Sequence, residues 1–301
     1  MRTQFTGVGT ALITPFTRGG ALDEAAIKRL ARRQIDAGIH FLVPCGTTGE
    51  TPTLSPAERR RVVELVVKEA AGRVPVLAGA GGYDTKEVAR AAREMQDAGA
   101  AGLLSVTPYY NKPTPEGLMQ HFTSVAEATP LPIILYNVPG RTGCNIDAAT
   151  CAALATIPTV IGVKEASGNI QQMIEICKAV PAEFLVMSGD DALTLPLMAV
   201  GGRGIISVAS NEIPAEMVQM VEAAERGDFA AARAVHTRIV PLMLGNFVES
   251  NPGPVKFAMA AMGLCEEVFR LPMVSPRAAS QQKILDILKE LGLPLASGVR
   301  A

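Results

Sequence analysis

Eight short apolar segments, each about the length of a β-strand, recur along this chain of 301 residues. They are rich in Val, Ile and Leu and are apolar throughout, which is typical of parallel strands covered on both faces. We expect these strands at residues 6–14, 39–45, 74–79, 102–107, 132–137, 160–164, 184–188 and 203–209. Because segments with helical periodicity separate them, the pattern predicts an α/β protein.

The helical segments carry their own start and stop signals. Ser55, Pro56 and Glu58 match the N-terminus of a helix that begins with a capping box. Several helical patterns end in a glycine directly before the next strand, as a left-handed C-terminal cap requires. These glycines are Gly38, Gly99 and Gly201.

Eight strand–helix units that end near residue 226 predict a (β/α)8 barrel, or TIM barrel, over residues 1–226. A doubly wound sheet is the alternative, but it normally uses fewer strands. Residues 227–301 contain helical periodicity without a β-rich segment. We therefore expect a C-terminal helical extension packed on the barrel.

Composition excludes several classes of function. The 28 Lys and Arg residues against 29 Asp and Glu leave a net charge of -1 without a block of either sign, which argues against nucleic acid and an anionic membrane surface as partners. No apolar segment approaches the roughly 18 to 20 residues of a membrane span, and we find no signal peptide. Five cysteines without a Cys-x-x-Cys pair favour reduced thiols and a cytoplasmic location.

Cofactor motifs are missing from the sequence. The three histidines have no metal-ligand spacing, so we expect no metal site. Glycine-rich segments at residues 79–82 and 201–204 match neither a dinucleotide fingerprint nor a P-loop. We expect tight turns there, with phosphate binding by the second segment as an alternative.

One lysine stands apart from the other eight. Lys164 ends an apolar strand and so lies at the rim where TIM barrels place their active sites, whereas the others lie in segments where a solvated surface amine is expected. Lys164 either pairs with Glu165 or reaches water, or it is a desolvated amine that forms a Schiff base with a ketone. Its position alone does not decide between these roles.

Other polar residues gather at strand ends. Three of the four tyrosines, Tyr109, Tyr110 and Tyr136, lie at or just beyond them. The Gly-Thr-Thr-Gly-Glu segment at residues 46–50 offers hydroxyl and N–H groups to a carboxylate, although this pattern is also common in plain turns. Arg141 either holds a substrate carboxylate through two hydrogen bonds or pairs with a surface carboxylate.

Taken together, four segments resemble the dihydrodipicolinate synthases, the family of 4-hydroxy-tetrahydrodipicolinate synthases. They are Gly-Thr-Thr-Gly-Glu at 46–50, Pro-Tyr-Tyr-Asn-Lys-Pro at 108–113, Tyr-Asn-Val-Pro-Gly-Arg-Thr-Gly at 136–143 and Gly-Val-Lys-Glu-Ala-Ser-Gly-Asn at 162–169. The similarity covers nearly the whole chain. It implies a TIM-barrel lyase of lysine and diaminopimelate biosynthesis that condenses pyruvate with L-aspartate 4-semialdehyde, without a metal or organic cofactor.

The resemblance also implies catalytic roles. Lys164 corresponds to the Schiff-base nucleophile of the pyruvate-dependent class I lyases. Thr47, Tyr136 and Tyr110 correspond to a proton relay, in which Tyr110 reaches in from a neighbouring subunit. A tyrosine suits this role because its phenol both donates and accepts hydrogen bonds. The implied assembly is a homotetramer built from two tight dimers.

The substrate-binding residues follow from the same resemblance. Thr48, together with Thr47, corresponds to the site of the pyruvate carboxylate, and the backbone at Gly189 and Ile206 to the lining of the pyruvate pocket. Arg141 corresponds to the residue that receives the carboxylate of the semialdehyde. A related pyruvate-dependent aldolase acting on a hydroxy-keto acid or keto-sugar acid is the alternative, and it needs no such arginine. A second alternative is a non-catalytic ligand-binding barrel, in which the presence of Lys, Tyr, Thr and Arg at the strand ends would be a coincidence.

The chain departs from lysine-sensitive members of that family. Those members carry histidines where this chain has Pro56 and Arg59, and an asparagine where it has Tyr83. Glu87, which resembles the carboxylate that receives the amine of the effector, is present. Because Arg59 is always charged and repels a cation, we expect feedback inhibition by lysine to be weak or absent.

Overall fold

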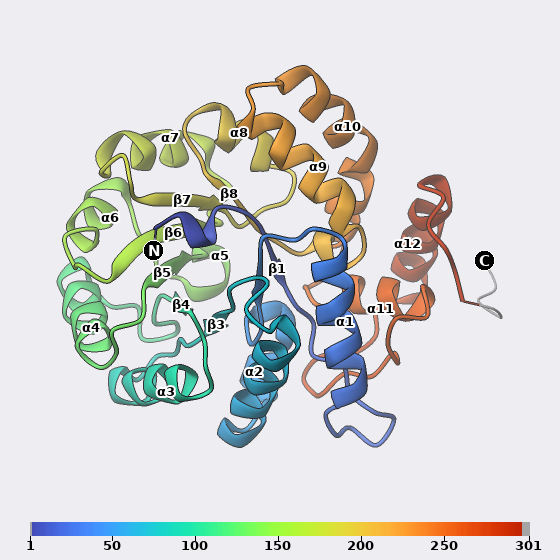
Figure 1. The fold of residues 1–301 in the computed structure, drawn as a ribbon, viewed down its shortest axis with the longest axis horizontal. Coiled ribbons are helices and arrows are strands. Elements are labelled where there is room, and N and C mark those ends of the chain that lie inside the picture. Colours follow the sequence, from blue (N-terminus) through green and yellow to red (C-terminus); the bar gives the residue numbers. More distant parts are fainter. Residues whose placement is uncertain (1, 297–301) are drawn as a thin grey trace.

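The computed structural model describes residues 2–296, and its centre is a sheet of eight parallel strands (Figure 1). The strand order is β2-β1-β8-β7-β6-β5-β4-β3, and a single parallel bridge between Leu42 and Val76 brings β2 and β3 together, so that the barrel is nearly closed. The strands are β1 (Gly7–Ala11), β2 (Phe41–Val43), β3 (Leu77–Gly79), β4 (Gly102–Val106), β5 (Ile133–Asn137), β6 (Val160–Glu165), β7 (Leu185–Ser188) and β8 (Gly204–Ser207). Each lies within a segment expected from the sequence, or extends it by one residue.

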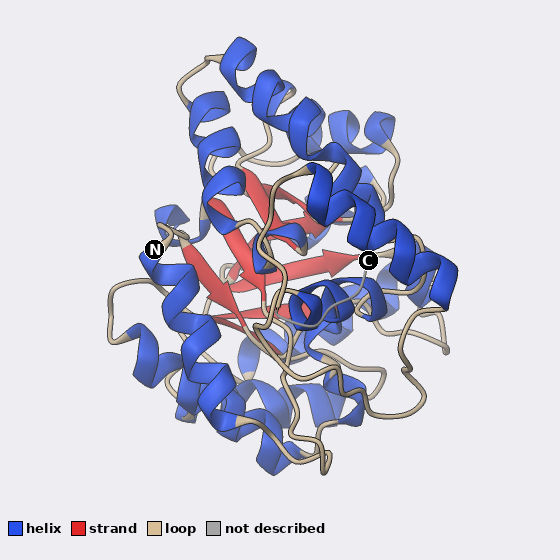
Figure 2. Ribbon diagram, turned by 90° about the vertical axis from the view of Figure 1, so that its right-hand side faces the viewer, coloured by secondary structure: helices blue, strands red, loops and turns tan. Residues whose placement is uncertain are grey.

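Helices surround the strands on the outside of the barrel (Figures 1 and 2). They are α1 (Glu24–Asp36), α2 (Pro56–Ala70), α3 (Thr85–Asp97), α4 (Pro115–Glu127), α6 (Ala148–Leu154), α7 (Ile170–Ala179), α8 (Thr194–Ala199) and α9 (Pro214–Glu225). The short helix α5 (Pro139–Thr142) lies instead in the loop that follows β5. Alternation of parallel strands with outer helices is the (β/α)8 TIM barrel, which confirms the expected fold.

Three further helices follow the barrel: α10 (Phe229–Gly245), α11 (Gly253–Ala261) and α12 (Ala278–Glu290). Helix α10 packs against α9 and α12, and α12 also packs against α11. The boundary proposed between residues 226 and 227 falls in the short link between α9 and α10. The end of the extension, residues 297–301, lies outside the described residues.

Local signals define the helix ends as expected. The Ser55 hydroxyl accepts a hydrogen bond from the Glu58 backbone N–H at 3.2 Å, and the Glu58 carboxylate accepts one from the Ser55 N–H at 2.9 Å. This is a complete capping box. The glycines after α1, α3 and α8 have φ values of +85°, +89° and +113°, which residues with a Cβ rarely adopt.

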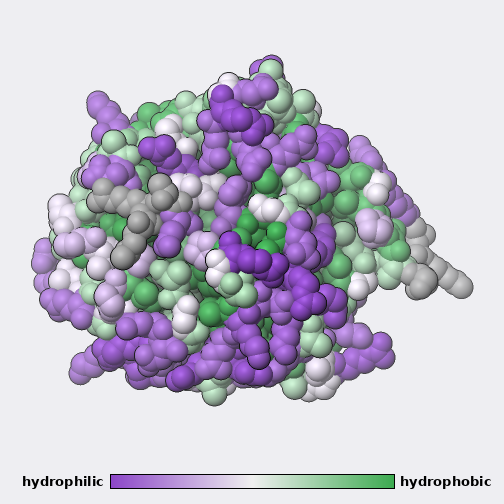
Figure 3. Space-filling model, in the orientation of Figure 1, coloured by the Kyte–Doolittle hydropathy of each residue, from purple (hydrophilic) through white to green (hydrophobic). Residues whose placement is uncertain are grey.

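Both faces of the strands are buried, which explains why the strand segments are apolar throughout. Ile134 and Tyr136 of β5 belong to a cluster inside the barrel, whereas Ile133 and Leu135 pack under the helices. On the face drawn in Figure 3, hydrophilic residues are most continuous along the lower edge, over α2 and α3. No helix within residues 2–296 is long and apolar enough to cross a membrane.

Candidate active site

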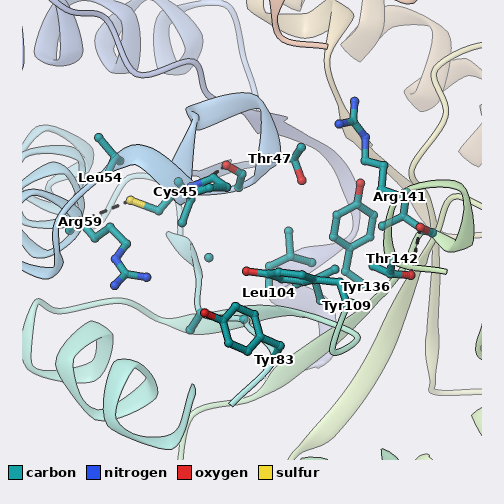
Figure 4. Close-up of a pocket in the computed structure, with 18 residues that line it drawn as sticks. Cys45, Thr47, Leu54, Arg59, Tyr83, Leu104, Tyr109, Tyr136, Arg141 and Thr142 are labelled. Carbon is teal, nitrogen blue, oxygen red and sulfur yellow. Dashed lines mark hydrogen bonds between the residues drawn. The ribbon is translucent and has the colours of Figure 1, made fainter. Parts of the chain in front are cut away.

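A cavity of about 510 Å³ opens where the carboxyl ends of several strands meet (Figure 4). The polar side chains of its wall come from loops after β2, β3, β4 and β5, from β5 itself and from α2. They include Thr47, Arg59, Tyr83, Tyr109, Tyr136 and Arg141. Among the described residues that line this space, two are arginines and none carries a carboxylate, so an anionic ligand is favoured.

Lys164 lies beside Tyr136, one of the residues that line this cavity. Lys164 and Tyr136 are paired in register on the neighbouring strands β6 and β5, and the Lys164 Nζ lies 4.3 Å from the centre of the Tyr136 ring. Only 5% of Lys164 is exposed. The Glu165 carboxylate instead accepts hydrogen bonds from Asn137 and the Ser167 N–H, so the described contacts do not support the expected alternative of a Lys164–Glu165 pair.

Close packing limits what can stand beside this lysine. A Cβ atom at Gly189, just beyond β7, would lie 2.9 Å from Cε of Lys164, so the glycine leaves room for the lysine side chain. Ile206 on β8 is wholly buried in the same barrel-interior cluster as Tyr136. The structure thus places Gly189 against Lys164 and Ile206 within the barrel, although neither lines the open cavity.

The two threonines of the 46–50 segment have different surroundings. Both belong to a short 3-10 helix, Thr47–Gly49, directly after β2. Thr47 faces the cavity (Figure 4). Thr48 is 3% exposed, and its hydroxyl accepts a hydrogen bond from Nδ2 of Asn251 at 3.1 Å.

Asn251, which lies between α10 and α11, connects two candidate substrate-binding residues. In addition to its bond with Thr48, its backbone carbonyl accepts a hydrogen bond from the Arg141 guanidinium at 3.1 Å. Arg141 has no ion pair among the described residues, and this contact replaces the surface carboxylate considered as its alternative partner. The helical extension therefore contributes to the site, a contact that no local pattern around Asn251 indicates.

A second buried lysine, Lys256, forms an ion pair with Glu50, the last residue of the 46–50 segment. Lys256 on α11 is wholly buried and its Nζ lies 2.5 Å from the carboxylate of Glu50, which is 2% exposed. The ammonium group also lies 4.1 Å from the centre of the Phe16 ring. The interpretation of Lys256 as a solvated surface amine is therefore wrong. The local sequence does not indicate its burial, because the partner carboxylate lies 206 positions away.

The three strand-end tyrosines separate in the structure. Tyr136 and Tyr109 line the cavity, and Tyr109 packs edge-on against Tyr83 with ring centroids 5.3 Å apart. Burial raises the pKa of Tyr109 above its ordinary value. Tyr110 is 92% exposed, has a φ of +70° and lies outside the cavity lining. Within a single chain, the structure does not bring Tyr110 to the other candidate residues.

The glycine-rich segment at residues 79–82, expected only as a turn, also contributes to the cavity wall. A Cβ atom at Gly79 would lie 1.8 Å from the carbonyl oxygen of Cys45, so only glycine allows these two strand ends to approach. Within residues 2–296 no three His, Cys, Asp or Glu side chains are grouped so that they could hold a metal ion.

Comparison with known proteins identifies close relatives of this chain. Residues 4–291 match the model of the "Dihydrodipicolinate synthetase family". A 4-hydroxy-tetrahydrodipicolinate synthase from Koribacter versatilis (strain Ellin345) is 52% identical over 288 residues, which are 95% of this chain and 96% of the relative. The crystal structure of dihydrodipicolinate synthase from Aquifex aeolicus has a TM-score of 0.95 and 43% identity, covering 97% of this chain and all of the relative. A structure described as the first monomeric dihydrodipicolinate synthase variant has a TM-score of 0.95 and 41% identity, covering 97% and 98%.

Proposed function

The chain belongs to the dihydrodipicolinate synthetase family, and we propose that it condenses pyruvate with L-aspartate 4-semialdehyde through an imine on Lys164. Its activity is that of a 4-hydroxy-tetrahydrodipicolinate synthase, a class I lyase of lysine and diaminopimelate biosynthesis. The observation that carries the assignment to Lys164 is its burial against Tyr136 at the end of β6.

The chemistry divides into steps that a buried amine can perform. The neutral amine of Lys164 attacks the ketone carbon of pyruvate, and water leaves to give an iminium ion. This cation withdraws electrons, so that the pyruvate methyl group loses a proton and an enamine forms. The enamine carbon attacks the aldehyde carbon of the second substrate. The amine of that substrate then displaces Lys164 and closes the ring. Because the iminium is itself the electron sink, the reaction needs no metal or organic cofactor.

Hydroxyl groups around Lys164 supply the proton transfers in this proposal. The ring of Tyr136 packs against Lys164, and Tyr136 and Thr47 line the same cavity, which supports a role for both in exchanging protons with the reacting atoms. Thr48 adds a hydroxyl for the pyruvate carboxylate. The backbone at Gly189 and Ile206 lines the pyruvate pocket in this proposal, which the packing of Gly189 against Lys164 supports.

Arg141 provides specificity for the semialdehyde. It lies on α5, beyond the end of β5, and therefore nearer the mouth of the cavity than Lys164. Its guanidinium has no carboxylate partner within the described chain, so it is available to a substrate carboxylate. A keto-sugar-acid aldolase would retain Lys164 and Tyr136 but would not need this group.

An assay of the purified protein separates these two substrate classes. We expect rapid turnover of pyruvate with aspartate semialdehyde and at least about 100-fold lower kcat/KM for any sugar-derived keto acid in a matched panel, about 2.7 kcal/mol of discrimination. Faster turnover of a keto-sugar acid would contradict the assignment of the semialdehyde to Arg141.

We further propose a cytoplasmic homotetramer made of two tight dimers. Tyr110 is almost fully exposed and held at a positive φ, a placement that suits a side chain reaching into a partner's site. The large apolar residues Ile170, Ile174 and Val200 are also exposed, on α7 and just after α8, and offer a second contact surface. All five cysteines are free thiols, which supports a reducing compartment.

Mixing two inactive variants tests the shared site. A Tyr110→Phe subunit keeps its own Lys164, and a Lys164→Ala subunit offers its intact Tyr110 to the partner. A hybrid dimer then contains one complete site, so activity should return after subunit exchange. Absence of activity, with exchange demonstrated by mass spectrometry, would place the function of Tyr110 within its own chain.

A further inference from the structure

Tyr136 and Lys164 are each followed by a polar residue that points to the other face of its strand. Asn137 and Glu165 are also paired in register, and both are 0% exposed. Nδ2 of Asn137 donates a hydrogen bond to Oε2 of Glu165 at 2.7 Å. The contact between the two candidate catalytic residues inside the barrel is therefore matched by a hydrogen bond between their neighbours outside it.

Asn137 also closes the loop that carries Arg141. Its Oδ1 accepts a hydrogen bond from the Ile146 N–H at 2.9 Å, and its Nδ2 donates to Oδ1 of Asn145 at 2.9 Å. The loop between Asn137 and Ile146 contains α5 and Arg141. One buried amide group thus fixes both ends of the loop that holds the candidate semialdehyde-binding residue.

Glu165 performs the same task on the next strand. Its Oε1 accepts a hydrogen bond from the Ser167 N–H at 2.8 Å, which fixes the turn that directly follows Lys164 and Glu165. No ion pair of Glu165 with Lys, Arg or His is found in the described part of the chain. Glu165 also lies close enough to the Cys151 thiol to affect its pKa. Burial, and to a smaller extent the charge of Glu165, raises the pKa of Cys151 to about 12, so this thiol is neutral.

A buried carboxylate without a cationic partner is costly for folding, because burial removes its hydration. Apolar side chains in place of Asn137 and Glu165 would pack β5 against β6 at a lower cost in folding free energy. The donors to Glu165 found among residues 2–296 lie on elements adjoining the site: Asn137 on β5, Ser167 after β6 and, at 3.4 Å, Gln172 on α7. We propose that Asn137 and Glu165 are positioning residues that set the placement of Tyr136, Lys164 and the Arg141 loop for catalysis.

This inference rests on the proposed function, since it assumes that Lys164 forms the imine. Two isosteric variants test it: Glu165→Gln removes the buried charge, and Asn137→Asp places a second charge beside it. We expect each to lower kcat, and the rate at which borohydride traps the pyruvate imine on Lys164, by about 10- to 100-fold, with the KM for pyruvate changed less than about threefold. Displacement of the reacting groups affects the chemical steps more than binding.

The double variant Asn137→Asp/Glu165→Gln is the decisive measurement. It restores one amide and one carboxylate with their positions exchanged, but not the hydrogen bond to Asn145, so both rates should rise at least about fivefold above those of Asn137→Asp while staying below those of the wild type. A merely structural role predicts recovery of the melting temperature alone. Should Glu165→Gln fail to fold, Asn145→Ala, at the exposed end of the network, should lower the trapping rate about three- to tenfold.

A second buried amide–carboxylate pair provides the control. Asn246 donates to Glu212 at 2.6 Å, and each residue is 1% exposed. Glu212→Gln should change the melting temperature but leave kcat and imine trapping within twofold of the wild type. Wild-type rates in Glu165→Gln, or no recovery in the double variant, would overturn the positioning role. A wild-type protein that gives no adduct on Lys164 would instead overturn the proposed function.

Discussion

Nζ of Lys164 lies 4.3 Å from the centre of the Tyr136 ring, on side chains that neighbouring strands present in register. The aromatic face shields the amine on one side, and the phenol of the same ring lines the cavity above it. In the proposed mechanism, one residue therefore supplies both an apolar wall for Lys164 and a hydroxyl group for proton transfer.

Tyr136→Phe separates these two contributions. The phenylalanine ring keeps the packing against Lys164 but cannot exchange a proton, so we expect kcat to fall about 10²- to 10⁴-fold while the fold and melting temperature are maintained. Steady-state kinetics with both substrates measures the effect. A kcat within about threefold of the wild type would exclude Tyr136 from the relay.

Arg141→Ala should affect the aldehyde substrate more than pyruvate. Loss of a charge-assisted contact with the semialdehyde carboxylate costs about 2 to 4 kcal/mol, or roughly 30- to 1000-fold in kcat/KM for that substrate. Arg203→Ala is the matched control, because Arg203 also donates to a backbone carbonyl, that of Ala182. An equal loss in the rate of pyruvate imine formation would contradict the role assigned to Arg141.

The barrel was predictable because its signals are local. Continuous apolar strands report burial on both faces, and Ser55 with Glu58 defines a helix start through contacts three residues apart. Lys164 could be singled out for the same reason, since it directly follows an apolar strand. The position of a residue at a strand end was therefore readable from the sequence without its partners.

Contacts between distant segments could not be predicted in this way. Asn251 meets Thr48 across 203 positions, and Lys256 meets Glu50 across 206. Both residues lie in segments whose local pattern indicates only a turn and a helix. Their role depends on how the helical extension packs on the barrel, which hydrophobic periodicity does not specify. The exposure of Tyr110 likewise depends on three-dimensional packing rather than on the local pattern.

The Lys256–Glu50 pair gives a stability prediction. Lys256→Met leaves the Glu50 carboxylate buried without its partner, so we expect the free energy of unfolding to fall by about 3 to 5 kcal/mol. Glu50→Gln/Lys256→Met should recover part of that loss. Arg18→Met, which removes an exposed pair with Glu266, should change stability by less than about 1 kcal/mol in the same denaturant titration. Equal effects of the buried and exposed single variants would refute the prediction.

Feedback inhibition by lysine is expected to be weak or absent. Arg59 and Tyr83 both line the cavity, so a cationic effector beside them meets a fixed positive charge. Glu87, the remaining carboxylate, is paired with Arg90 at 2.8 Å. Initial rates at subsaturating pyruvate should show half-inhibition only above roughly 1 mM lysine, about -4 kcal/mol of binding. Half-inhibition at lower concentrations would show that these residues do not disable such a site.

Borohydride trapping tests the central claim most directly. Reduction of the protein in the presence of pyruvate should add the mass of one reduced adduct per chain, and peptide mapping should locate it on Lys164. The Lys164→Ala variant should give no adduct. The second buried lysine, Lys256, is the internal control, because it shares the burial of Lys164 but is paired with Glu50. A pyruvate-dependent adduct on Lys256 or any other lysine, or none in the wild type, would contradict the mechanism.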